Sequence, residues 1–306
     1  MEEMSDILDE LQKRQEKIRR YDEERLQRLQ QDPLVTAFLQ EHSLDRDYLK
    51  DHLRIFDDAS SSRKLCQNCR SLADCQQERA GERWQLQFAG GEAYTTLEYC
   101  PYALQKQKKQ QEKKQLLYND IPEDLQDLRF ADLTFDADNK ELILNLEKVL
   151  TGEEKKGYYL YGDFGTGKTY ISIALCHEFL QQGKSCAFVK VNDFVARQRK
   201  LIIEDIEEQE KEIEALKRAD VLFLDDIGNE GVSSFSRDDL LFTVLDYRME
   251  RKKLTFFTSN QDLNSLRQHY AYDKKLKEEK LKADRLLERI RILARPYCLG
   301  GRDRRG

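Results

Sequence analysis

The chain has 306 residues, of which 36% are charged, with only 14 glycines and 4 prolines. So few turn-forming residues exclude an all-β sandwich or barrel, and the length favours two domains or one domain with an appendage. The net charge of −6, from 52 basic and 58 acidic residues, excludes a basic surface over the whole molecule, so nucleic acid could bind only at local patches. We find no apolar run of membrane-spanning length and no apolar leader, so we expect a cytoplasmic protein without membrane contact.

Residues 1–57 are predicted to be helical. Apolar residues recur at helical spacing between residues 5 and 31, and Pro33 marks the end of this helix. Two interpretations are open for this segment. It is either a solvated helical hairpin or a module that docks on a partner, since its apolar stripe is too narrow to form a core alone. A second helical stretch carries Val35, Phe38 and Leu39 on one face.

Residues 60–103 hold four of the seven cysteines and the only tryptophan, within a short alternating β pattern. A Cys-x-x-Cys pair followed by further thiols is a ligand set that tetrahedral zinc prefers, and thiols of a cytosolic protein rarely form disulfides. We therefore predict a zinc knuckle that completes an N-terminal domain over residues 1–103, with free thiols as the alternative. The predicted zinc ligands are Cys66, Cys69, Cys75 and Cys100, whereas Cys176, Cys186 and Cys298 are expected in the core.

Residues 104–119 are predicted to be a basic linker or a helix extension, because residues 105–114 carry five lysines and one glutamate. After residue 120, short apolar runs alternate with helical segments, which is typical of a parallel sheet buried on both faces. We expect an α/β domain with a five-stranded parallel sheet over residues 120–306. The predicted strands are residues 158–161, 186–189, 221–224, 255–258 and 297–299.

Residues 162–169 match the G-x-x-x-x-G-K-[ST] phosphate loop without a mismatch. The glycines let backbone N–H groups approach phosphate oxygens, Lys168 reaches the β- and γ-phosphates, and the Thr169 hydroxyl is a ligand for Mg²⁺. A predicted strand precedes the loop and a predicted helix follows it, which is the setting that an ATP site requires. The residues predicted to bind ATP are Gly162, Asp163, Phe164, Gly165, Thr166, Gly167, Lys168, Thr169 and Tyr170.

Two carboxylates, Asp225 and Asp226, follow the apolar strand at residues 221–224. Asp225 is predicted to hold Mg²⁺ together with Thr169, and Asp226 to orient and deprotonate the attacking water. Asn260 follows the next strand, and its side chain is predicted to reach the γ-phosphate or that water. The sequence thus predicts an ATP-hydrolysing site at one edge of the sheet.

Seven arginines and two acidic residues lie in residues 285–305. Arg285 and Arg289 share one face of a predicted helix, and an arginine from an adjacent subunit can stabilise the transition state of ATP hydrolysis. A solvated basic helix is the alternative. Weaker candidates for the same role are Arg237, Arg248 and Arg251.

Together these motifs resemble the AAA+ replicative helicase loaders of Gram-positive bacteria, the DnaI family. The resemblance implies an ATPase that delivers the hexameric replicative helicase onto single-stranded DNA, with other primosome proteins and through an ATP-dependent ring or spiral of its own subunits. It also implies that the N-terminal domain grips the helicase, and that Arg285 acts in trans while Arg289 senses nucleotide, with the two roles exchangeable. The likeness spans nearly the whole chain and rests on residues 157–170, 224–228, 236–238, 245–249, 255–260 and 282–291.

For DNA contact, the sequence offers a basic and aromatic combination around Phe194, which suits a single strand. The same segment turns acidic at residues 204–214, so a solvated helix face is the alternative. Two other functions also stay open: a transposition-associated ATPase of the IstB kind, and an adaptor that binds ATP as a switch without hydrolysing it. The basic residues near Phe194 are Lys190, Arg197, Arg199 and Lys200.

Overall fold

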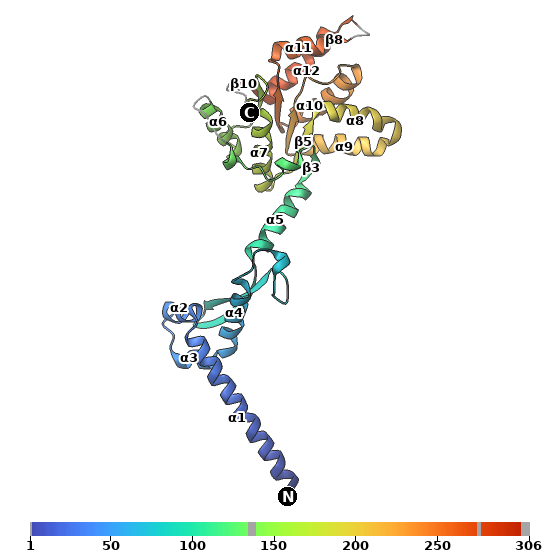
Figure 1. Cartoon of the computed structure of the whole chain (residues 1–306). Coiled ribbons are helices and arrows are strands. Elements are labelled where there is room, and N and C mark those ends of the chain that lie inside the picture. Colours follow the sequence, from blue (N-terminus) through green and yellow to red (C-terminus); the bar gives the residue numbers. More distant parts are fainter. Residues whose placement is uncertain (1, 134–138, 274–276, 301–306) are drawn as a thin grey trace. The chain divides into compact units, whose positions relative to one another are not determined.

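The computed structural model describes residues 2–133, 139–273 and 277–300. The chain divides into two compact units, Met1–Lys109 and Gln110–Gly306, and each is described by itself (Figure 1). The boundary lies within helix α5 (Pro101–Gln115). In the described residues, no helix is both long and apolar enough to cross a bilayer.

Helices and one β-hairpin form the first unit. Alternate residues of a strand point to the same face, so one face of the hairpin can pack on the helices. Leu29, Val35, Leu49 and Phe56 are fully buried in this core, and Leu86 and Ala93 reach it from the hairpin. The elements are α1 (Glu2–Gln30), α2 (Pro33–Glu41), α3 (Arg46–Asp51), α4 (Leu53–Cys66), η1 (Leu72–Asp74), β1 (Glu82–Ala89) and β2 (Glu92–Tyr99).

Polar contacts fix the first helices of this unit. Asp32 caps α2, because its Oδ1 accepts the Leu34 N–H at 3.0 Å, and Pro33 occupies the first helical position, where no N–H is needed. Asp57 of α4 accepts hydrogen bonds from Arg25 Nε at 2.6 Å and from Arg28. The contacts of Asp57 tie the C-terminal end of α1 to α4.

The second unit is built on a six-stranded sheet with the order β10-β4-β7-β6-β5-β3, in which every neighbouring pair is parallel. Each of the five predicted strands has a counterpart, but the last one, expected at residues 297–299, is β10 (Ala294–Cys298) and begins three residues earlier. The expected number of five is nevertheless wrong, because β3 (Leu116–Asn119) pairs with β5 as a sixth strand. The sequence places residues 116–119 in the linker because a lysine-rich run precedes them, whereas the edge of β5 supplies their hydrogen-bond partners.

The remaining strands of the sheet are β4 (Gly157–Tyr161), β5 (Cys186–Lys190), β6 (Val221–Asp225), β7 (Leu254–Ser259) and β10 (Ala294–Cys298). The helices are α6 (Lys140–Leu150), α7 (Lys168–Gln181), α8 (Val191–Glu204), α9 (Ile206–Arg218), α10 (Thr243–Glu250), α11 (Leu263–Ala271) and α12 (Lys280–Leu293). Shorter elements are η2 (Glu123–Leu125), η3 (Phe130–Asp132), the π-helical segment η5 (Phe235–Phe242), β8 (Tyr272–Asp273) and β9 (Lys277–Glu278).

Side chains on the two faces of the sheet form two separate cores. Phe188, Phe223 and Phe256, from three neighbouring strands, lie on one face, where the rings of Phe223 and Phe256 stack at 4.9 Å. The next residues along β6 and β7, Leu224 and Phe257, lie in the core on the other face. Burial on both faces explains why these strands are continuously apolar. The strand order brings the carboxyl ends of β4, β7 and β6 together at one edge.

Two arginines named as weak trans-acting candidates are structural instead. Arg248 is fully buried and donates to the carbonyls of Leu216 and Ala219, each at 2.8 Å. Arg237 is also fully buried and is paired with Asp238. A buried guanidinium with internal acceptors cannot reach a neighbouring subunit, so these two predictions are wrong.

Candidate nucleotide-binding site

A cleft of about 900 Å³ lies at the carboxyl-end edge of the sheet, next to the phosphate loop. Three loops meet there: the one between β4 and α7, the one after β6 and the one after β7. Apolar and aromatic side chains line part of it, which suits a nucleotide base, and carboxylates and lysines line the rest. The lining residues are Leu128, Asp132, Leu133, Phe164, Gly165, Gly167, Lys168, Thr169, Tyr170, Ile171, Lys190, Val191, Asn192, Asp193, Asp225, Asp226, Thr258 and Asn260.

The phosphate loop has the backbone that its glycines predict. Gly162, Gly165 and Gly167 have φ values of 142°, 77° and 93°, which favour glycine because it lacks a Cβ. A Cβ on Gly162 would lie 2.4 Å from the Leu299 carbonyl oxygen, so the loop must pass close to the end of β10. Gly167 caps α7, and the helix therefore points its N-terminus into the cleft, where it favours an anion.

The Lys168 side chain lies along the loop that it follows. Its ammonium group donates to the carbonyl oxygens of Gly162 and Asp163 at 2.9 and 2.8 Å, and the residue is 7% exposed. Because this lysine reaches the β- and γ-phosphates in such loops, these carbonyls mark the terminal-phosphate end of the site.

Asp225 joins the phosphate-loop helix to the sheet. Its Oδ1 accepts hydrogen bonds from Thr169 Oγ1 at 2.9 Å and from Thr258 Oγ1 at 2.6 Å. Burial raises the pKa of Asp225 above its usual value, while the two hydroxyl donors act in the opposite direction. A carboxylate beside a hydroxyl at a phosphate site is the hard-oxygen donor set that Mg²⁺ prefers, so Thr169 and Asp225 fit the predicted magnesium role.

Thr258 is a residue of this site that the sequence reasoning did not select. Besides contacting Asp225, its Oγ1 accepts the backbone N–H of Asp226 at 2.8 Å. It is the fifth residue of β7, and β7 lies beside β6 in the sheet. Only the pairing of β6 with β7 shows that this threonine faces the two aspartates.

Asp226 and Asn260 lie together, as predicted. The Asn260 Nδ2 atom donates to Asp226 Oδ1 at 3.2 Å, and Asn229 Nδ2 donates to Asp226 Oδ2 at 2.6 Å. Asp226 has a φ of 59°, in the left-handed region that most side chains avoid. The carboxylate is thus held in the cleft by amide donors on both oxygens.

Neither Arg285 nor Arg289 lines this cleft. Arg289 donates to Asp246 Oδ1 at 3.0 Å, and its guanidinium lies 4.8 Å from the centre of the Phe242 ring. Arg285 is exposed, and in the described part of the chain its side chain has no hydrogen-bond or ion-pair partner. Three further arginines of the predicted basic segment, Arg302, Arg304 and Arg305, lie outside the described residues.

The combination expected for DNA lacks its aromatic member at the surface, although Arg197, Arg199 and Lys200 are exposed. Phe194 is only 1% exposed, and its ring packs edge-on against Tyr118 at 5.3 Å, so it cannot stack on a base. Arg197 is paired with Glu212 of α9, with Nε 2.7 Å from Oε1. Lys190 lines the nucleotide cleft instead. The prediction of a stacking site at Phe194 is therefore wrong, because the residue belongs to the core of the α8–α9 pair.

The pKa of one predicted zinc ligand, Cys69, is affected by the other three. Partial burial raises the pKa of the Cys69 thiol, and the nearby thiols of Cys75, Cys66 and Cys100 raise it further. The sulfur atoms of Cys75 and Cys100 accept backbone N–H groups at 3.3 and 3.4 Å, a contact that also suits metal-bound thiolates. However, among the residues searched, all of them described, no three His, Cys, Asp or Glu side chains gather as a metal site requires. This arrangement does not support the zinc prediction.

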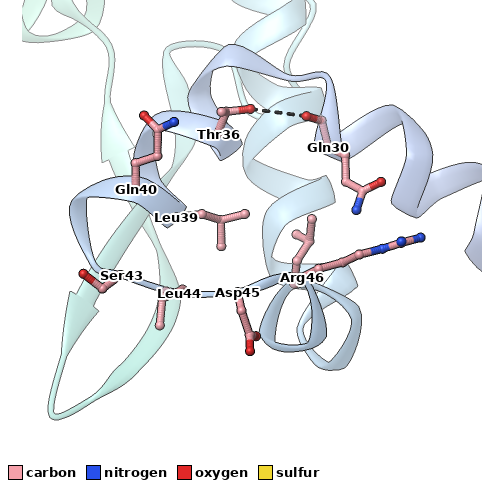
Figure 2. Close-up of a pocket in the computed structure, with 9 residues that line it drawn as sticks. Gln30, Thr36, Leu39, Gln40, Ser43, Leu44, Asp45 and Arg46 are labelled. Atoms are coloured by element: carbon pink, nitrogen blue, oxygen red, sulfur yellow. Dashed lines mark hydrogen bonds between the residues drawn. The ribbon is translucent and has the colours of Figure 1, made fainter.

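Figure 2 shows another cavity, of about 290 Å³, in the first unit. Its polar groups are used locally: Thr36 Oγ1 donates to the Gln30 carbonyl at 3.3 Å, and Asp45 caps α3 by accepting the Tyr48 N–H at 2.8 Å. We therefore assign it no part in nucleotide chemistry. It is lined by Gln30, Thr36, Leu39, Gln40, Ser43, Leu44, Asp45, Arg46 and Leu49.

The fold and the site define a P-loop ATPase of the AAA+ class. Residues 101–295 match the family described as "IstB-like ATP binding protein". The chain is 32% identical to the replicative helicase loader DnaI of Bacillus subtilis (strain 168) over 292 residues, which cover 92% of this chain and 93% of that protein. The chain belongs to the IstB-like ATP-binding proteins and, more narrowly, to the DnaI family of replicative helicase loaders.

Two solved structures agree with this assignment. A crystal structure of DnaI aligns with a TM-score of 0.53 and 32% identity, over 64% of this chain and all of the solved chain. A putative primosome component from Streptococcus pyogenes serotype M3 aligns with a TM-score of 0.52 and 30% identity, over 65% of this chain and all of the solved chain.

The role of Thr258 can be tested by Thr258→Val. This change removes one donor to Asp225 and the acceptor for the Asp226 N–H, at nearly constant volume. We expect the ATP turnover number to fall about tenfold, equivalent to about 1.4 kcal/mol, with ATP affinity changed less than about twofold. The exposed Thr243→Val is the matched control and should keep wild-type turnover. Unchanged ATP turnover in Thr258→Val would show that the two hydrogen bonds of this threonine do not contribute to catalysis.

Proposed function

We propose that this protein is an ATP-dependent loader that delivers a hexameric replicative DNA helicase onto single-stranded DNA during primosome assembly. The observation that carries the proposal is the 32% identity to a replicative helicase loader over 292 residues, which includes both units of the chain. The phosphate loop, both aspartates and Asn260 at one cleft support the dependence on ATP. Such a role belongs in the bacterial cytoplasm, together with other primosome proteins.

The residues of the cleft have distinct roles in this proposal. The backbone of residues 162–167 and the Lys168 ammonium bind the phosphates of ATP. Mg²⁺ held by Thr169 and Asp225 would neutralise phosphate charge. Asp226 accepts the proton of the attacking water, and Asn260 orients that water, since its amide lies 3.2 Å from the Asp226 carboxylate.

A second copy of the chain is proposed to complete the site. Arg285 is exposed on α12 and free of partners within the described residues, so it can reach the γ-phosphate of a neighbouring subunit. Arg289, also on α12, contacts Asp246 of α10 and Phe242 of η5. Its proposed role, to sense nucleotide from within its own subunit, rests on the likeness to the helicase loaders. ATP-dependent self-association into a ring or spiral follows from an arginine that acts in trans.

The first unit is proposed to grip the helicase. The two-thirds of the chain that match the IstB-like family begin at residue 101, whereas the likeness to the helicase loader also includes most of the first unit. This extra likeness favours a loader over a transposition-associated ATPase. An adaptor that only binds ATP is disfavoured by the amide donors that hold Asp226 in the cleft.

A zinc ion in the first unit is also part of the proposal. Its support is chemical: four thiols within 35 residues, two of them accepting backbone N–H groups, and a small hairpin that gains stability from a metal.

Lys168→Ala separates ATP binding from helicase binding. Because the ammonium group that contacts the phosphates is lost, we expect no measurable ATP binding and no helicase loading. Helicase capture in a pull-down with the replicative helicase of the same bacterium should persist, since the first unit is intact. The exposed Lys155→Ala should behave as wild type in both assays. Loss of helicase capture in Lys168→Ala would contradict the proposed division of labour.

Mixing variants tests whether Arg285 acts in trans. Arg285→Ala should bind ATP normally and lose most of its turnover, because the transition-state charge is not compensated. Turnover should partly return when Arg285→Ala, which has an intact phosphate loop, is mixed with inactive Lys168→Ala, which supplies the arginine. Arg291→Ala, an exposed arginine of the same helix, is the control. Failure of every mixture to exceed the sum of its components would place Arg285 outside the neighbouring site.

Zinc content decides the metal proposal. Protein purified without added metal should contain about one zinc per chain, and Cys66→Ser should lose it, because tetrahedral zinc needs four ligands. Cys298 of the ATPase unit is exposed, so its expected place in the core is wrong, and Cys298→Ser should retain the metal. Wild-type protein without zinc would leave the four cysteines as free thiols.

A further inference from the structure

The turn that follows β6 holds Asp226 in an unusual conformation. Asp226 has a φ of 59° and Gly228 a φ of 96°, so two of three successive residues are left-handed. An aspartate in this region is strained by about 1 kcal/mol or more and persists only where its surroundings fix it. Something beyond local preference must therefore hold this turn in place.

Glu230 is the buried group under this turn. It is 1% exposed, and its Oε2 accepts the Gly228 N–H at 2.9 Å. Its Oε1 accepts the hydroxyl of Tyr270 on α11, which is fully buried. Burial and the Glu230 charge raise the pKa of Tyr270, so its hydroxyl stays protonated as the donor. A buried carboxylate is costly unless it is hydrogen-bonded, and here each oxygen has a donor.

The same contacts continue from Tyr270 towards α12. The Tyr270 carbonyl accepts a hydrogen bond from Arg237 NH1 at 2.9 Å. Arg237 is fully buried and also donates to Glu279, which directly precedes α12. The helix that carries Arg285 therefore begins at the far end of a series of contacts that runs from the Asp226 turn through Glu230, Tyr270 and Arg237.

We propose that Glu230 is a positioning residue for ATP hydrolysis: through Gly228 it fixes the Asp226 turn at the cleft, and through Tyr270 and Arg237 it couples that turn to α12. The inference rests on the proposed function, because it takes Asp226 as the base. Glu230 itself does not line the cleft. Its effect is on the placement of Asp226, and not on the binding of ATP.

Isosteric variants of the full-length protein test this role. In Glu230→Gln an amide nitrogen replaces one carboxylate oxygen, so the side chain cannot accept both the Gly228 N–H and the Tyr270 hydroxyl equally well. We expect kcat for ATP to fall about tenfold to a hundredfold, as for a misplaced catalytic group, while KM changes less than about twofold. Tyr270→Phe, which removes the hydroxyl, should lower kcat in the same way.

The matched control is Glu212→Gln. Glu212 is another buried carboxylate, 8% exposed, which accepts hydrogen bonds from Arg197 and Gln198 and does not line the cleft. A loss of thermal stability is expected in both glutamate variants, but only Glu230→Gln should lower kcat. This difference separates a positioning role from a contribution to folding alone.

Three results would overturn the proposal: wild-type kcat in Glu230→Gln and Tyr270→Phe, a raised KM with unchanged kcat, or an equal loss of kcat in Glu212→Gln. A helicase pull-down with the same preparations tests the loader function separately from the positioning role of Glu230. A wild-type protein that hydrolyses ATP but captures no helicase would refute the loader function, and the comparison of kcat values would still decide the role of Glu230.

Discussion

The nucleotide site depends on one buried carboxylate, that of Asp225. One of its oxygens is shared by Thr169, in the first turn of α7, and Thr258, near the end of β7, at 2.9 and 2.6 Å. These bonds join the phosphate loop, β6 and β7 at one point. Burial raises the pKa of Asp225, and the two hydroxyl donors act in the opposite direction. The same two hydroxyls fix the carboxylate beside the phosphate loop, where its oxygens fit a divalent cation. This junction ties the first turn of α7 to the ends of two strands that the sheet already holds side by side.

Asp225 joins other elements, whereas the neighbouring carboxylate, Asp226, is itself held in place by the residues around it. It lies on a strained turn, and its geometry depends on groups that surround it, namely Thr258, Asn229, Asn260 and the buried Glu230. Strain that is fixed by buried polar contacts is typical of sites where a reacting group must be pre-organised. In the proposed mechanism this turn connects chemistry at the cleft with α12, the helix whose exposed Arg285 is proposed to act on a neighbouring subunit. ATP hydrolysis and subunit contact would then share one structural element.

Local sequence patterns predicted much of this protein. The phosphate loop is contiguous, and its glycine spacing fixes its backbone, so the loop, Lys168 and the capped helix follow from eight residues. The strands β4, β5, β6 and β7 were visible as apolar runs, and Asn260, chosen because it follows β7, lies beside Asp226. Errors arose where burial decides the role. Phe194 fills a core instead of a DNA surface, and Arg237 and Arg248 are internal. The strand β3 was assigned to the linker because a lysine-rich run precedes it.

The sequence by itself determined the class of fold, the phosphate loop and the family, because these depend on residues that are close along the chain or on the whole pattern of motifs. Only the tertiary structure decided that Thr258 bonds Asp225 across 33 positions and that Glu230 bonds Tyr270 across 40. Such pairs come together because β6 lies beside β7 and α11 packs nearby. No local sequence pattern specifies the order of the strands in a sheet. A side chain's chemistry is set by its residue type, whereas its partner and its burial are set by the fold.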